Sequence, residues 1–363
     1  MGTTARVVIL PKDTKTLRIE EIELPEPGPT QVEVRQFASG ICHSQLHQMG
    51  RIRQNTLLLG HESTGVVNEV GSDVTHVRAG DIVLVTWVPR NPVESRAPPK
   101  GVTLPVSDGV ARTRDVFTWA DVTLADEQYV VKADSSIARD VTAIVGCAVI
   151  TGAGAIINTA NIKPGESVAI IGVGGVGLCA VAAARNSGAD PIIAVDLDDE
   201  KLGFARYFGA THTINARTED PVEAIHALTL QPDAYTFTRV PVSGADYVLD
   251  CIGKPETIGQ MLASCRKGQF AVRSGGTAVL VGLPIDKFEM NGMELLLSEK
   301  HFFGSAGGSC TPDRDIPIFL DWHKNGQLDL DALVTQRFKL DEINEAVAAM
   351  EAGKILGRAI IEF

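Results

Sequence analysis

Val168-Ala-Ile-Ile-Gly-Val-Gly-Gly-Val-Gly177 is the stretch that decides the fold, because a short β-branched run ends here in spaced glycines. Gly172 allows the strand to turn sharply, Gly174 lets a pyrophosphate approach the backbone, and Gly177 lets the following helix pack close to the strand. The phosphates then lie at the positive N-terminus of that helix. The stretch therefore predicts a strand–turn–helix unit that binds a dinucleotide.

An acid at the end of the next apolar run supports this prediction. Asp196 closes Ile193-Ala-Val-Asp196, about 20 residues beyond Gly177, where a carboxylate accepts hydrogen bonds from the adenosine ribose. The carboxylate would repel the additional phosphate of NADP, so it predicts NAD. A glycine-rich turn in another α/β protein is the alternative, but the framing by strand, helix, strand and acid favours the dinucleotide site.

Length and charge limit the class of protein. The chain has 363 residues, and two domains are expected because single cores stop growing near ~250–300 residues. A net charge of −12 without a basic cluster argues against nucleic acid or an anionic membrane as partner. The uncharged run 168–184 is too short for a membrane span. Six cysteines without framework spacing, and no signal-peptide pattern, favour the cytoplasm.

The pattern of apolar runs and turn residues changes along the chain. Short Val- and Ile-rich runs separated by turn residues fill the first part, and from Pro164 onward strands alternate with helices, which predicts a parallel sheet covered on both faces. The predicted fold class is α/β, with a β-rich domain over 1–150, a doubly wound domain over 151–306, and 307–363 returning to the first domain. The expected strands of the doubly wound domain are 167–171, 191–195, 211–214, 247–250 and 277–281.

Three pieces of the β-rich domain carry metal-binding side chains. They are Gly40-Ile-Cys-His-Ser-Gln-Leu-His47, Gly60-His-Glu62 and Gly146-Cys147. A single buried Cys or His is usually an ordinary core residue. Together, Cys42, His61 and Cys147 provide two thiolates and one imidazole, a donor set that binds zinc and leaves its fourth position open for substrate.

These motifs occur in an order that resembles the zinc-dependent alcohol dehydrogenases of the medium-chain dehydrogenase/reductase superfamily. The resemblance covers nearly the whole chain and is closest to the branch that oxidises aryl and terpenoid primary alcohols. It implies a GroES-like catalytic domain, a Rossmann domain, one catalytic zinc per chain held by Cys42, His61 and Cys147, and an alcohol or aldehyde as the small-molecule substrate.

The resemblance also implies roles for single residues. Glu62 matches the acid beside the metal, Ser44 the hydroxyl that takes the alcohol's proton, and His47 the outer member of that relay, unless it is a solvated surface histidine. Trp87 matches an aromatic of the substrate pocket, unless it is ordinary core. The residues that match cofactor contacts are His43, Thr151, Gly172, Gly174, Gly175, Val176, Gly177, Asp196, Lys201, Val281 and Arg358.

The expected chemistry is hydride transfer between a zinc-bound primary alcohol and NAD, reversible from the aldehyde. An NADH-dependent reductase of an aldehyde or conjugated enal is a second interpretation, and a dinucleotide-binding protein without turnover is a third. Most relatives form homodimers or homotetramers through a sheet edge. Residues 276–281 and the apolar stretch around Phe302-Phe303 suit such an edge.

The sequence departs from the family in three places. Residues 88–122 contain no cysteine, so no structural zinc is expected, and packing with ion pairs must order this lobe. Gln45 stands where relatives often have an Asp that orients the zinc-binding histidine, which predicts a loosely held metal. The segments 231–243 and 267–274 look longer than usual and are expected to be loops, either surface decoration or an oligomer contact.

Overall fold

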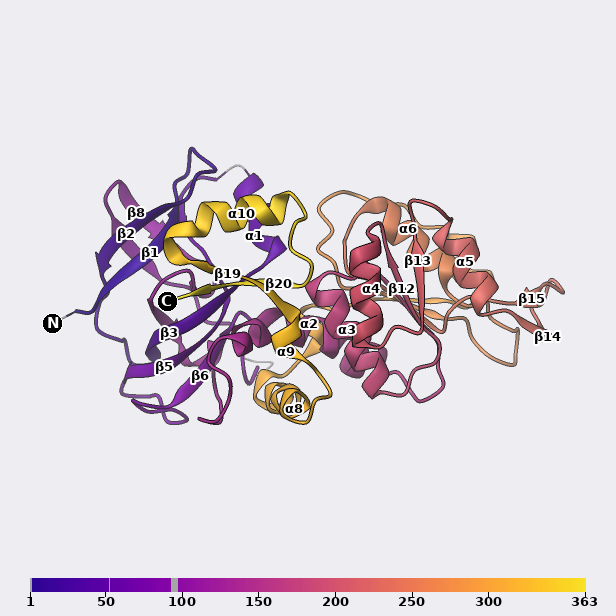
Figure 1. Cartoon of the computed structure of the whole chain (residues 1–363), viewed down its shortest axis with the longest axis horizontal. Helices are drawn as coiled ribbons and strands as arrows, with labels where there is room; N and C mark the ends of the chain where they lie inside the picture. The colour runs from indigo at the N-terminus through magenta and orange to yellow at the C-terminus, as the bar shows by residue number, and fades with distance from the viewer. Residues whose placement is uncertain (1, 52, 93–96) are drawn as a thin grey trace. The chain divides into compact units, whose positions relative to one another are not determined.

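The computed structural model describes residues 2–51, 53–92 and 97–363. The chain divides into two compact units (Figure 1): Met1–Ala148 with Thr311–Asn325 and Asp329–Phe363, and Val149–Cys310 with Gly326–Leu328. The division lies at 148/149 and 310/311, whereas the sequence predicts 150/151 and 306/307. The second boundary moves because the turn 307–310 is held by the helical residues before it: the Cys310 thiol donates to the Ile150 carbonyl at 3.2 Å.

A seven-stranded sheet forms the centre of the first unit, in the order β10-β6-β5-β3-β20-β19 with β9 also paired to β3. Its strands are β3 (Gln31–Ile41), β5 (Glu62–Val70), β6 (Ile82–Thr86), β9 (Val122–Asp126), β10 (Val130–Lys132), β19 (Val334–Lys339) and β20 (Arg358–Glu362). The C-terminal strand β20 pairs antiparallel with β3, with Ala359 opposite Ile41. This register brings the C-terminal segment beside the end of β3, where Cys42 follows.

A second sheet of the same unit contains the lobe that lacks cysteines. Its order is β2-β1-β4-β8-β7, formed by β1 (Thr4–Leu10), β2 (Arg18–Glu23), β4 (Thr56–Leu58), β7 (Thr103–Val106) and β8 (Gly109–Arg112). The hairpin β7–β8 buries Leu104 and Ala111 in a core with Phe117. Arg90 adds an ion pair to Asp313 at 2.6 Å. Strand pairing, apolar burial and an ion pair therefore order this lobe; residues 93–96, part of its proline-rich segment, lie outside the described residues.

The second unit is a six-stranded parallel sheet in the order β13-β12-β11-β16-β17-β18, which confirms the doubly wound α/β class. The strands are β11 (Val168–Ile171), β12 (Ile192–Asp196), β13 (His212–Asn215), β16 (Tyr247–Asp250), β17 (Thr277–Leu280) and β18 (His301–Gly304). The crossover helices are α3 (Gly175–Asn186), α4 (Asp199–Phe208), α5 (Pro221–Leu228) and α6 (Pro255–Ser264). The Asp220 side chain caps α5 by accepting from the amides of Val222 and Glu223.

The remaining helices are short or terminal. They are α1 (His43–Gly50), α2 (Ile150–Gly154), α7 (Gly292–Leu297), α8 (Pro312–Lys324), α9 (Leu330–Leu333) and α10 (Ile343–Glu351). Single helical turns of other types are Glu127–Tyr129, Val141–Ile144, Val145–Val149, Ala155–Ala160, Gly307–Ser309 and Leu340–Glu342.

Two expectations about the second unit are wrong. Residues 231–243 are not a loop, because they form the two-stranded hairpin β14 (Gln231–Tyr235) and β15 (Pro241–Val242). The segment 276–281 is not a sheet edge, because β17 pairs with β16 on one side and with β18 on the other. Strand β18, which contains Phe302 and Phe303, is the edge strand next to β17. A parallel strand order cannot be read from one sequence, since successive strands need not be neighbours.

One helical run among the described residues, Val141–Ala160, is long and apolar enough to cross a membrane. However, 83% of its apolar window is buried inside the protein, as expected for a core helix. The run 168–184, which the sequence analysis rejects as a span, consists of β11, the glycine turn and part of α3.

Candidate active site

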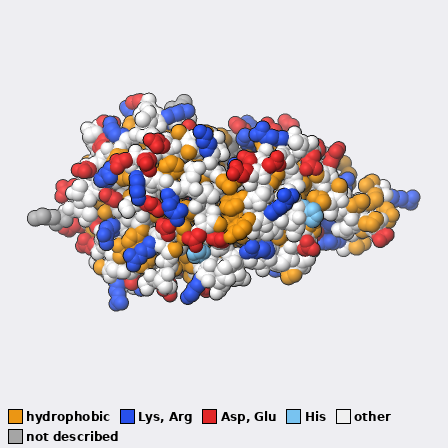
Figure 2. Space-filling view, in the orientation of Figure 1, with side chains coloured by type: hydrophobic (Ala, Val, Ile, Leu, Met, Phe, Trp, Pro, Cys, Tyr) orange, Lys and Arg blue, Asp and Glu red, His pale blue; other side chains and the backbone are white. Residues whose placement is uncertain are grey.

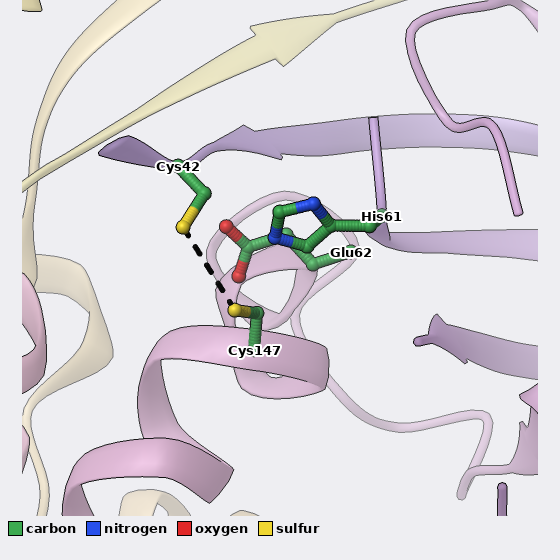
Figure 3. A group of neighbouring side chains, drawn as sticks. All are labelled: Cys42, His61, Glu62 and Cys147. Carbon is green, nitrogen blue, oxygen red and sulfur yellow. Dashed lines mark hydrogen bonds between the residues drawn. The ribbon is translucent and has the colours of Figure 1, made fainter. Parts of the chain in front are cut away.

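Four side chains of the first unit converge from three elements (Figure 3). Cys42 follows β3 at the start of α1, His61 and Glu62 stand at the beginning of β5, and Cys147 lies in the helical turn Val145–Val149. One ligand atom of each lies within 4.8 Å of the others, and the two sulfurs are 3.9 Å apart. The structure thus brings together the predicted ligands Cys42, His61 and Cys147, with Glu62 beside them.

Glycines at two positions make this convergence possible. A Cβ on Gly40 would lie 2.5 Å from the Glu62 carboxyl carbon, so only glycine lets β3 pass this side chain. Gly60 has φ +90°, and a Cβ there would collide with the backbone of Trp119. The motifs Gly-Ile-Cys and Gly-His-Glu therefore contain both the donor and the glycine that makes room for the neighbouring segment.

The donor set fits a zinc ion. His61 Nε2 is buried and has no hydrogen-bond partner among the described residues, and such a nitrogen is costly unless it binds something. The hydrogen bond with Cys147 lowers the pKa of the Cys42 thiol well below its ordinary value, and His61 and Arg358 lower it further, against the effect of burial. Two thiols, one of them readily ionised, and one imidazole match the preference of Zn²⁺.

The Glu62 carboxylate has hydrogen-bond partners of its own in the protein. Its carboxylate is fully buried, accepts a hydrogen bond from Arg358 Nη2 and accepts from the Ala148 amide at 3.3 Å. A carboxylate held in this way leaves the two sulfurs and the imidazole as the natural ligands. A zinc ion held by these three donors would keep a ligand position for a substrate oxygen.

Arg358 is buried against Glu62. The resemblance implied a pyrophosphate contact for Arg358, which stays a prediction, and sequence reasoning missed the ion pair with Glu62. No sequence signal could have revealed it, since the two residues lie 296 positions apart and meet only through the pairing of β20 with β3.

The predicted relay residues lie on α1. Ser44 donates its hydroxyl proton to Cys42 Sγ at 3.3 Å, which places this hydroxyl beside the candidate metal position. His47 lies one turn further along, half-buried, with its ring 5.5 Å from that of the exposed His43. Burial lowers the pKa of His47, and the charges of His43 and Arg51 lower it further. The lowered pKa favours the neutral ring of His47, the form that can accept a proton.

Gln45 is buried on the same helix but does not contact His61 through a hydrogen bond in the described part of the chain. Its Oε1 accepts from the Cys42 amide at 3.4 Å, and its Nε2 is buried without a partner. The Gln45 side chain thus caps α1 at Cys42, one of the predicted metal ligands. The sequence analysis expected it instead at the position of an Asp that orients His61.

We expect Gln45→Asp to slow the loss of zinc to a chelator by about 10–100-fold, since a carboxylate near the ligands increases their basicity and the local negative charge. The measurement is the rate of metal release to a coloured chelator. Gln48→Asp, on an exposed position of the same helix, is the matched control and should leave the rate unchanged. Equal rates for the wild type and Gln45→Asp would show that the amide does not weaken the site.

The glycine turn of the second unit has the predicted backbone. Gly172 has φ +87°, a Cβ on Gly177 would collide with the Gly172 carbonyl oxygen, and a Cβ on Gly174 would meet nothing within 4 Å. Gly174 is the N-cap residue of α3, and no side chain forms a capping hydrogen bond there. This open helix N-terminus is the place where a pyrophosphate can approach.

Asp196 ends β12 beside this turn. Its Oδ2 accepts from the Val173 amide at 3.0 Å and its Oδ1 from the Leu197 amide at 2.7 Å, so the carboxylate is fixed next to the glycine loop. Thr151, on α2, has a buried hydroxyl oxygen without a partner in the described residues.

The structure assigns the other predicted cofactor and pocket residues to the following elements. Gly175 and Val176 open α3, Lys201 is half-buried on α4, and Val281 follows β17. Trp87 is half-buried just after β6, whereas the fully buried tryptophan of this unit is Trp119. Their contacts with cofactor and substrate stay predictions.

Known sequences and structures are similar to this chain over nearly its whole length. A family described as "Alcohol dehydrogenase GroES-like domain" matches residues 28–135, and one described as "Zinc-binding dehydrogenase" matches 175–325. The S-(hydroxymethyl)glutathione dehydrogenase of Paracoccus denitrificans is 30% identical over 389 residues, covering 99% of this chain and 100% of that protein.

Among solved structures, the benzyl alcohol dehydrogenase of Acinetobacter calcoaceticus is similar with a TM-score of 0.86 and 27% identity over 99% of both chains. An alcohol dehydrogenase zinc-binding domain protein from Burkholderia ambifaria gives a TM-score of 0.86 and 28% identity over 100% of both. A Cys₂His cluster and a dinucleotide turn define a zinc-dependent dehydrogenase class. The chain belongs to the zinc-dependent alcohol dehydrogenase family of the medium-chain dehydrogenase/reductase superfamily, and it is an oxidoreductase.

Proposed function

We propose that this protein is an NAD-dependent dehydrogenase that oxidises a primary aryl or terpenoid alcohol to its aldehyde, with one catalytic zinc per chain. The observation that carries the proposal is the convergence of Cys42, His61 and Cys147 within ligand distance. The similarity to a benzyl alcohol dehydrogenase supports the aryl substrate, as does the half-buried Trp87 near the end of β6.

The side chains of this site have separable tasks. When bound, zinc supplies Lewis acidity that lowers the pKa of an alcohol and polarises an aldehyde. Cys42, Cys147 and His61 would hold it, and the Arg358–Glu62 pair keeps a buried carboxylate in place behind the ligands. Ser44 would accept the alcohol's proton, and His47 would be the outer member of the relay that carries it to solvent. NAD, when bound, would supply the nicotinamide that accepts the hydride.

A spectrophotometric substrate screen tests the proposed function. Benzyl, cinnamyl, terpenoid and short aliphatic alcohols, together with S-(hydroxymethyl)glutathione, are offered with NAD, and formation of NADH is followed. The proposal expects the highest kcat/KM with the aryl or terpenoid alcohols. A preference for S-(hydroxymethyl)glutathione would assign the activity that the Paracoccus relative is named for. NADH binding without oxidation of any alcohol in zinc-loaded protein would leave only a dinucleotide-binding protein.

Asp196 is proposed to select NAD over NADP. We expect Asp196→Gly to raise the ratio of kcat/KM with NADP to that with NAD by about 10-fold or more, since removing a charge that opposes a phosphate is worth at least about 1.4 kcal/mol. Asp196→Asn isolates the charge, because its amide oxygen can still accept from the Val173 amide, and it should raise the ratio as well. An unchanged ratio in both variants would exclude the ribose role.

We also propose one zinc per chain, a cytoplasmic location and a homo-oligomer. No disulfide joins cysteines in the described part of the chain, which suits a reducing compartment, and residues 88–122 hold no cysteine that could bind a second zinc. Metal analysis showing two zincs per chain would contradict the first of these statements.

A further inference from the structure

Two buried hydroxyl groups hold the main chain of the motif Gly60-His-Glu62. The Glu62 amide donates to Thr118 Oγ1 at 3.2 Å, and the Glu62 carbonyl accepts from Ser39 Oγ at 3.0 Å. The two hydroxyl oxygens are 2.8 Å apart. When Thr118 donates to Ser39 and Ser39 donates to the Glu62 carbonyl, each hydroxyl serves as both donor and acceptor. The two side chains then close a ring of hydrogen bonds around the main chain of Glu62.

These hydroxyls take over where the pairing of β3 with β5 ends. The register of the two strands ends with Ser39 opposite Ser63, and Glu62 is the residue before Ser63, at the start of β5. A peptide bond is planar, so a fixed amide of Glu62 fixes the peptide plane that joins it to His61. Figure 3 shows the His61 ring and the Glu62 carboxyl group side by side, next to the two sulfurs. The direction of both side chains therefore depends on the hydroxyls of Ser39 and Thr118.

Thr118 is itself fixed to the segments that lead to two of the metal-binding side chains. The amides of Thr118 and Trp119 donate to the Leu59 carbonyl at 3.0 and 3.1 Å, shortly before His61. Trp119 Nε1 donates to the Gly40 carbonyl at 3.1 Å, shortly before Cys42 in the chain. These bonds fix the Thr118 hydroxyl relative to the main chain on both sides of the candidate metal position.

The residue before Thr118 belongs to the core of the lobe that lacks cysteines. Phe117 packs with Leu104 and Ala111 of the hairpin β7–β8, whereas Trp119 belongs to a neighbouring core of the same unit. Thr118 thus stands between two packed clusters that hold its main chain from both sides. The packing of the lobe therefore contributes to the position of the Thr118 hydroxyl.

Burial makes these hydrogen bonds hard to replace. Figure 2 shows charged side chains over the outside of the protein, where water competes for each hydrogen bond. By contrast, Ser39, Glu62 and Thr118 are each 0% exposed. Removal of one hydroxyl leaves a buried polar group of the Glu62 main chain without its partner, and such a group shifts toward another partner or stays at a cost in free energy.

We propose that Thr118, together with Ser39, is a positioning residue of the metal centre. Its hydroxyl orients the peptide between His61 and Glu62, and thereby aims the imidazole at the place where Cys42 and Cys147 meet. The proposal rests on the zinc site of the proposed function. Groups that orient a metal ligand commonly change metal affinity by about 10–100-fold, and here the oriented part is the main chain beside the ligand.

The first test uses Thr118→Val, which keeps the shape of threonine and removes the hydroxyl. We expect the variant to release zinc to a chelator about 10–100-fold faster than the wild type. The visible absorption of the protein loaded with Co²⁺ in place of zinc should also change, because that absorption depends on the number and direction of the ligands. Thr118→Ser keeps the hydroxyl and should restore both the release rate and the cobalt spectrum.

Thr123→Val is the matched control. Thr123 lies in β9, is equally buried and donates its hydroxyl to the Phe117 carbonyl, in the same segment as Thr118. Its loss removes a buried hydrogen bond without touching Glu62, so the release rate and the spectrum should stay as in the wild type. An equal change in Thr123→Val, or no rescue by Thr118→Ser, would assign the effect to general loosening and overturn the proposal.

Ser39→Ala tests the other hydroxyl, and thermal unfolding of the metal-free proteins verifies that each variant is folded. Its effect should have the same direction but be smaller, because Thr118 Oγ1 lies 3.3 Å from the Glu62 carbonyl and can donate to it directly. Folded Thr118→Val or Ser39→Ala protein with the wild-type release rate and cobalt spectrum would overturn the positioning role alone. Wild-type protein that takes up neither zinc nor cobalt would refute the metal centre of the proposed function, and the positioning role with it.

Discussion

Cys42→Ala is expected to reduce the zinc content of the purified protein to near zero and to lower kcat/KM for alcohol oxidation by about 10³-fold or more. The variant removes one of two sulfurs that lie 3.9 Å apart, and a Cys₂His set reduced to two donors no longer competes with water for the ion. Lewis-acid stabilisation is worth several kcal/mol, and about 1.4 kcal/mol corresponds to a factor of ten in rate. Metal analysis and steady-state kinetics measure the two effects.

Cys179→Ala is the matched control for this experiment. Cys179 is fully buried in α3, and burial raises its pKa well above the ordinary value, so it is an inert apolar thiol. The control should keep its zinc and its activity, and Cys42→Ala should keep its affinity for NADH because the glycine turn lies in the other unit. A Cys42→Ala protein that retains both zinc and activity would refute the proposed metal centre.

Arg358→Ala should destabilise the first unit by about 3–5 kcal/mol, the usual cost of leaving a buried charge without its partner. Glu62 is fully buried and Arg358 is 5% exposed, so water cannot replace the missing guanidinium. Thermal and denaturant unfolding of zinc-loaded protein measure the loss. The first unit should unfold earlier while the transition of the second unit stays in place.

Two further variants separate the ion pair from simple packing. Glu62→Gln/Arg358→Gln removes both charges and should recover most of the lost stability, because no buried charge is left unpaired. Lys339→Ala breaks a pair with Glu362 in which the lysine side chain is 66% exposed, and it should cost less than about 1 kcal/mol. A double variant as unstable as Arg358→Ala would assign the loss to packing instead of charge.

The sequence predicted the second unit well because its information is local. The turn from Gly172 to Gly177 requires particular backbone conformations, and alternating apolar runs and helices leave few arrangements other than a parallel sheet. The expected strands agree with the observed ones to within one or two residues; for example, 247–250 is β16 itself. The hairpin β14–β15 was missed, since its strands are mostly exposed and show no clear alternation.

The residues of the site also differ in whether the sequence alone could identify them. Cys42, His61 and Cys147 could be picked out because the chemistry of zinc demands those donor types and a glycine stands shortly before each of them. The ion-pair partner of Glu62 could not be identified from the sequence, because Arg358 reaches Glu62 only after β20 has paired with β3. The same holds for Gln45, whose side chain caps the amide of Cys42 rather than holding His61.

By itself, the sequence determined which residues carry chemistry and how each local stretch of backbone bends, because these depend on side-chain type and on neighbours a few positions away. The tertiary structure alone decided which distant groups meet: the Glu62–Arg358 pair, the pairing of β4 with β8 in the second sheet, and the contact of Phe237 with Phe270. Strand pairing over long separations in the chain fixes these contacts, and no short-range pattern encodes it.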